Sequence, residues 1–64
     1  MSKMEARHKG EVIAEGERDN IDARAVAAME ERNIPDCEIH EWVEERQEWS
    51  FDRNLWNTAL RASG

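Results

Sequence analysis

The stretch PDCEIHEWVEERQEW, residues 35–49, has the clearest amphipathic pattern in the chain and decides the predicted fold. At the 3.6-residue period of an α-helix, one stripe holds most of the large side chains and a neighbouring face holds glutamates. The stripe consists of Ile39, Trp42, Val43, Arg46 and Trp49, and the glutamate face of Glu38, Glu41, Glu45 and Glu48. Pro35 suits a first helical turn, because its missing amide proton would have no partner there. The pattern predicts a helix over residues 35–49.

The segment before this stretch predicts another helix, over residues 19–33. Its apolar side chains recur at helical spacing from Ile21 to Met29, and several alanines add helix propensity. Asp19 or Asn20 can cap the first turn, and Asn33 can take the left-handed conformation that ends a helix.

The segment after residue 49 fits two arrangements. Trp42, Trp49 and Trp56 are seven residues apart, so one unbroken helix would align them in a seam. That helix would leave Phe51 and Leu55 on the opposite side, in water. A break near Ser50 removes the conflict, and we therefore expect a third helix over residues 51–62.

Residues 1–18 have no clear helical period, and we expect them to be loosely ordered or strand-like. The apolar trio Val12, Ile13 and Ala14 lies between Gly10 and Gly16 and suits either a short strand or a helical turn. A strand would need a partner strand, which the pattern does not identify. The expected fold class is mostly α: one small three-helix domain, residues 1–64, with a flexible or short β-like N-terminal segment.

The charge of the chain is strongly acidic and unevenly distributed. The formal net charge is −6 over 64 residues, and residues 11–48 carry thirteen acidic residues against four arginines. A negative surface repels phosphate backbones and attracts basic surfaces, so direct nucleic-acid binding is disfavoured. The plain alternative is a solvated acidic face that keeps a small domain soluble.

Catalysis, cofactors and metal binding find little support. Cys37 and His40 are three residues apart and could share a helix face, but only His8 offers another nitrogen or sulfur ligand. No third member of a catalytic group is recognisable, so we expect neither an enzyme nor a metal or cofactor site. Cys37 is the single cysteine, which fits a reducing compartment, and no apolar run is long enough to span a membrane. We therefore expect a cytoplasmic protein.

One local pattern lies in residues 21–43, where a helix, Asn33, Ile34 and a second helix with Ile39 and Trp42 follow one another. This arrangement resembles, loosely, the helix-turn-helix of repressors and transposases. The resemblance implies a DNA-binding regulator or an antitoxin-like module. Met29 departs from the small residue usual before the turn, and the second helix is too acidic to read DNA.

Function is expected to be non-catalytic binding to a basic surface on a larger protein or complex. Small acidic inhibitors from phages and mobile elements, of the anti-restriction and anti-CRISPR kind, act in this way by imitating nucleic acid; this comparison rests on size and charge alone. The expected binding residues are Glu38, Glu41, Glu45, Glu48 and Trp49. Trp49 is expected to be partly exposed, while at least two of the three tryptophans belong to the core. A small accessory subunit of a larger complex is a further alternative, and a homodimer is compatible with the sequence.

Overall fold

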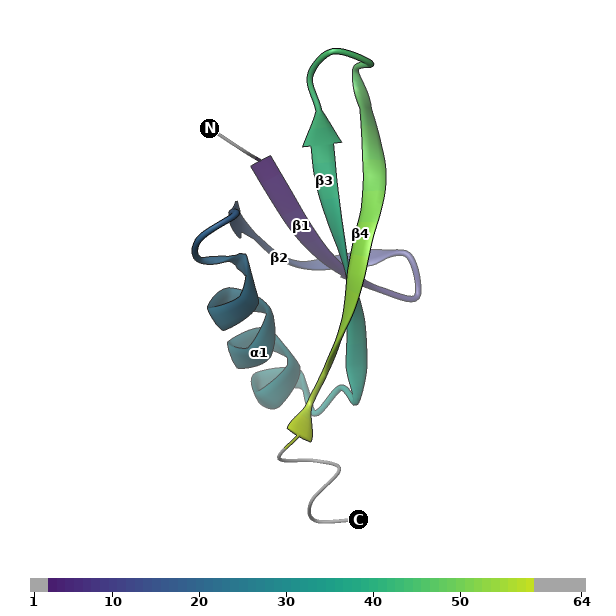
Figure 1. Cartoon of the computed structure of the whole chain (residues 1–64). Coiled ribbons are helices and arrows are strands. Elements are labelled where there is room, and N and C mark those ends of the chain that lie inside the picture. Colours follow the sequence, from purple (N-terminus) through teal and green to yellow (C-terminus); the bar gives the residue numbers. More distant parts are fainter. Residues whose placement is uncertain (1–2, 59–64) are drawn as a thin grey trace.

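The computed structural model describes residues 3–58, and these form one four-stranded antiparallel sheet with one helix against it (Figure 1). The strand order in the sheet is β2-β1-β3-β4. The elements in chain order are β1 (Lys3–His8), β2 (Glu11–Glu17), α1 (Ile21–Arg32), β3 (Asp36–Val43) and β4 (Glu48–Trp56). The β2–α1–β3 connection carries the chain across one face of the sheet, and α1 packs on that face (Figure 1).

The predicted three-helix domain is wrong. The range 35–49 forms β3, a turn and the first residues of β4, and the range 51–56 completes β4. Residues 59–62 of the predicted third helix lie outside the described residues. The resemblance to a helix-turn-helix fails for the same reason, since its second helix is a strand. Burial alternates from one residue to the next along β3, as it does in a strand with one covered face: Cys37 and Ile39 are buried, whereas Glu38 and His40 are not. The helical prediction overlooked this two-residue period.

Helix α1 lies within the range 19–33 that was predicted as helical. Ile21, Ala25 and Met29 are its buried residues, at the spacing of one helix face. Asn33 ends the helix in the left-handed conformation, with φ 60°. The start differs from the expectation, because the Asn20 side chain makes no cap hydrogen bond to the helix and accepts one from the Glu17 amide at 2.8 Å.

The N-terminal segment forms a β-hairpin. Val12, Ile13 and Ala14, whose pattern suits either a strand or a helical turn, belong to strand β2, and the partner of β2 is β1. Lys9 and Gly10, which join the two strands, both have positive φ, 52° and 83°. A two-residue connection of this kind matches the twist of the strands that it joins.

The core is a single layer between the sheet and α1. Its buried apolar members come from β1, α1 and β3; they are Met4, Ala6, Ile21, Ala25, Met29, Cys37 and Ile39. No tryptophan belongs to it: Trp42 and Trp49 are partly exposed, and Trp56 is 50% exposed. The expectation that at least two tryptophans fill the core is therefore wrong, whereas Trp49 is partly exposed as expected.

We expect Met29→Ala to destabilise the fold strongly, because the Met29 side chain is fully buried in this thin core. Truncations of this kind cost about 2–5 kcal/mol, and a single core of this size supplies roughly 3–5 kcal/mol in total. Urea unfolding followed by circular dichroism measures the loss. The matched control is Val26→Ala on the exposed side of α1, which we expect to cost under about 1 kcal/mol. Equal losses in both variants would contradict the assigned core.

The buried thiol of Cys37 predicts a loss of stability at alkaline pH. Burial raises the pKa of Cys37 above its ordinary value of 9.0, and the charges of Asp36, Asp22 and Glu38 add to the rise. The stability that this group contributes is complete below the pKa of the unfolded thiol and is lost as pH rises through the folded-state pKa. We therefore expect the free energy of unfolding to fall above pH 9.0, and to fall less in Cys37→Ala. Urea unfolding at a series of pH values measures both; identical pH profiles would contradict the prediction.

Candidate functional site

The face of the sheet opposite α1 carries aromatic and charged side chains. We call it the open face; its members include Lys3, Glu5, Arg7, Glu38, His40, Trp42, Trp49 and Phe51. Trp42 lies opposite Trp49, with ring centroids 5.4 Å apart, and His40 lies opposite Phe51, at 5.8 Å. Both pairs meet edge to face, a favourable arrangement for aromatic rings.

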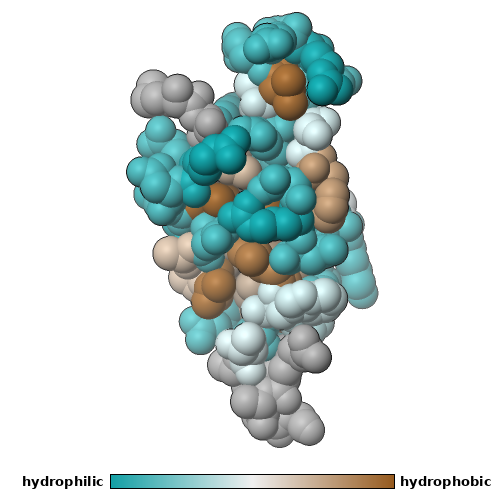
Figure 2. Space-filling model, in the orientation of Figure 1, coloured by the Kyte–Doolittle hydropathy of each residue, from teal (hydrophilic) through white to brown (hydrophobic). Residues whose placement is uncertain are grey.

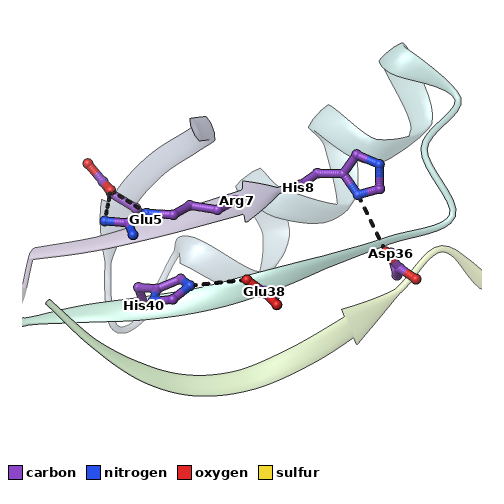
Figure 3. Close-up of polar contacts among 6 residues, drawn as sticks. All are labelled: Glu5, Arg7, His8, Asp36, Glu38 and His40. Carbon is purple, nitrogen blue, oxygen red and sulfur yellow. Dashed lines mark hydrogen bonds and ion pairs between the residues drawn. The ribbon is translucent and has the colours of Figure 1, made fainter. Parts of the chain in front are cut away.

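Two cations lie against the indole of Trp49. The Arg7 Cζ is 5.1 Å from the ring centroid, and the Lys3 Nζ is 5.8 Å from it. Arg7 is also held by Glu5, whose Oε1 accepts hydrogen bonds from Nη2 at 2.9 Å and Nε at 3.1 Å (Figure 3). By contrast, no carboxylate of residues 3–58 forms an ion pair with Lys3. The Arg7 charge is thus compensated locally, and the Lys3 charge is not.

Two histidines lie beside carboxylates along β1 and β3. The His40 Nε2 is 3.4 Å from the Glu38 Oε1, and the His8 Nδ1 is 3.4 Å from the Asp36 Oδ1 (Figure 3). Glu38 is exposed and lies next to an imidazole in the middle of β3, and it is not part of a row of glutamates.

The β3–β4 hairpin projects beyond the rest of the sheet. Strand β1 pairs with β3 only between Glu38 and Glu41, so β1 does not extend along the hairpin beyond that point. We call residues 42–49 the arm; it projects past α1 and the other strands in Figure 1. The arm carries three glutamates against Arg46. Hydrophilic atoms cover most of this end of the molecule in Figure 2.

The predicted binding residues do not share one face. Glu41 lies opposite the buried Met4, on the side of α1, and forms an ion pair with Arg18. Glu45 is exposed in the turn of the arm, and Glu48 begins β4 with its Oε1 3.5 Å from Arg46 Nη1. Trp49 is half-buried at the base of the arm. The structure therefore keeps Glu45, Glu48 and Trp49 on the arm, with Glu48 and Trp49 on opposite faces of β4, and places Glu38 and Glu41 outside the arm.

A hollow of about 440 Å³ lies at the base of the arm. Its lining consists of Lys3, Trp42, Glu44 and Trp49. The Trp42 Nε1 donates a hydrogen bond of 2.8 Å to the Glu44 Oε2, which fixes that carboxylate at the hollow. Lys3, Trp42 and Glu44 are not among the site residues expected from the sequence. The overlooked signal was the alternation of polar and apolar residues in β1 and β3, which is typical of strands.

Several other acidic side chains are compensated within the described part of the chain. Arg32 pairs with Glu11 at 2.8 Å, and Arg53 pairs with both Asp22 and Asp52. Burial by itself would lower the pKa of Arg53, but its hydrogen bonds and charge interactions with the two aspartates raise it above the usual value. Arg18, Arg32 and Arg53 thus each neutralise an acidic residue that lies far away in the sequence.

Cys37 and His40 do not form a site. Cys37 points into the core and His40 belongs to the open face, so the two side chains lie on opposite sides of β3. Among residues 3–58 there is no group of three or more His, Cys, Asp or Glu that could hold a metal ion. The described part of the chain also has no helix with the length and apolar character needed to cross a membrane.

Comparison of the chain with protein-family models, with curated proteins and with solved structures gave no significant match.

Proposed function

We propose that this chain is a non-catalytic binding protein that docks its acidic arm on a basic surface of a larger protein or complex. The observation that carries the proposal is the projecting arm, where acidic residues outnumber basic ones at the end of a hairpin that lies beyond β1 and α1. A projecting hairpin can enter a groove that the body of the domain cannot, and it presents its side chains on both faces.

Local electrostatics support the arm as the docking element. Its Glu45 has no ion pair with any residue in 3–58, and the Arg46–Glu48 pair is long and exposed. Exposed pairs of this kind contribute roughly 0–1 kcal/mol, so a basic partner can replace Arg46 at little cost. Elsewhere, Glu41 and Asp22 are engaged by Arg18 and Arg53. The arm therefore offers negative charge that the domain itself does not neutralise.

The proposal does not extend to imitation of nucleic acid. That mode of inhibition was expected from a row of outward carboxylates along a helix over residues 35–49, which the structure does not contain. In the sheet, Glu38, Glu41 and Glu45 lie on the open face, the α1 side and the turn, respectively. The broader function, docking on a basic protein surface, needs only the local charge of the arm.

Docking would also add to the stability of a domain with so thin a core, since a partner that binds only the folded state stabilises it. A partner would stabilise the domain in this way whether the chain acts as an inhibitor or as an accessory subunit. The proposed docking on a basic surface includes both roles. Because the single thiol of Cys37 is free and buried, we propose the reducing environment of the cytoplasm as the place of action.

The proposal predicts that Glu45→Lys/Glu48→Lys weakens binding to basic ligands by at least about tenfold. The probe is a fluorescent lysine oligomer, and fluorescence anisotropy at low ionic strength gives the dissociation constant. Both substituted side chains are exposed, so circular dichroism should show an unchanged fold. Added salt should weaken wild-type binding, because ions screen exposed charges.

The matched control is Glu30→Lys/Glu31→Lys, which changes the net charge equally on the exposed side of α1. We expect this control to lose much less affinity than the arm variant. Equal losses would show that net charge alone attracts the oligomer and would contradict a role for the arm. Absence of binding by the wild type would overturn the proposed function itself.

A further inference from the structure

The hollow at the base of the arm has the features of a receptor for a cationic side chain. Trp42 and Trp49 line it with their rings at 65° to one another, so the hollow is bounded by aromatic surface in two orientations. The face of an indole carries negative potential and attracts cations within about 6 Å of its centroid. The contacts that Trp49 makes with Lys3 and Arg7 show this attraction within the molecule.

Glu44 supplies the second element of such a receptor. Its Oε2 accepts the hydrogen bond from the Trp42 indole at 2.8 Å, and its Oε1 lies 3.4 Å from the Gln47 Nε2. Both contacts orient the carboxylate without neutralising its charge, because an indole and an amide are neutral donors. No cation of residues 3–58 forms an ion pair with Glu44.

Lys3 is the internal cation of the hollow. It lines the cavity and lies over Trp49, yet its ammonium group forms no ion pair with a carboxylate of residues 3–58. An exposed contact between an ammonium and an indole is weak, so displacement of Lys3 costs little. Arg7 differs, because two hydrogen bonds to Glu5 hold its guanidinium in place.

We propose that this hollow receives an arginine side chain of the basic partner, which displaces Lys3 and stacks on Trp49 beside the Glu44 carboxylate. The inference rests on the proposed function and names the group that the arm recognises. Arginine fits better than lysine, because a planar guanidinium can stack on an indole and also donate two parallel hydrogen bonds to a carboxylate. A lysine ammonium also donates hydrogen bonds, but it has no plane that can stack on the indole and no fork that matches both carboxylate oxygens.

The test compares the affinities of an arginine oligomer and a lysine oligomer of equal length by fluorescence anisotropy. We expect the wild type to bind the arginine oligomer at least about fivefold more tightly, and Trp49→Leu or Glu44→Gln to bring this ratio close to one. The matched control for Glu44→Gln is Glu30→Gln on the exposed side of α1, which should keep the wild-type ratio.

Lys3 supplies a test in the opposite direction. Lys3→Gln should increase the affinity for the arginine oligomer about threefold or more, because the competing cation is gone. Lys9→Gln removes the same charge from the β1–β2 turn, away from the hollow, and should change the affinity much less. Equal gains in both variants would contradict displacement of Lys3.

A measurement on the unmodified protein guards against variants that fail to fold. The indole N–H groups of Trp42 and Trp49 should shift in nitrogen–proton correlation spectra on addition of the arginine oligomer, while that of Trp56 stays in place. Shifts confined to Trp56, or none at all under saturating conditions, would overturn the inference. If both oligomers bind and depend on Glu45 and Glu48 but not on Trp49 or Glu44, the inference fails and the proposed function stands.

Discussion

The central position of β1 is the constraint on which the rest of the structure depends. This strand of six residues pairs with β2 on one side and with β3 on the other, and its Met4 and Ala6 are fully buried beneath α1. Without β1, the β3–β4 hairpin and an unpaired strand β2 would remain, and an isolated hairpin is marginally stable at best in water. Pairing with β1 also gives α1 an apolar surface to cover.

The open face follows from this one-sided arrangement. A strand sends successive side chains to opposite faces, so a sheet covered by a single helix exposes every second residue. In β3 and β4 these exposed positions hold Trp42, Trp49 and Phe51, side chains that would fill the core of a helical bundle. The domain therefore keeps a small core and presents aromatic surface, which is the kind of surface that binding sites use.

Charge on this protein is organised by contacts between distant residues. Arg18, Arg32 and Arg53 each pair with an acidic residue more than twenty positions away: Glu41, Glu11 and Asp22, respectively. These pairs reduce the local excess of negative charge around α1 and the sheet. Among residues 3–58, the carboxylates of the arm form an ion pair only with its own Arg46, and for this reason the arm keeps an excess of negative charge. The acidic residues are spread along the sequence, and the fold places part of their uncompensated negative charge on the projecting arm.

The sequence by itself determined the helix within residues 19–33, its end at Asn33, the acidic balance and the single free thiol, because each depends on composition or on neighbouring residues.

Only the tertiary structure decided the conformation of residues 36–56. Ile39, Trp42 and Trp49 fit a helical stripe, while Cys37 and Ile39 alternate with Glu38 and His40 as in a strand, so local pattern permits both. Pairing with β1, some thirty residues earlier in the chain, selects the strand. That selection also places Lys3, Glu44 and the two tryptophans around one hollow, since backbone hydrogen bonds between strands bring together residues that no local spacing relates.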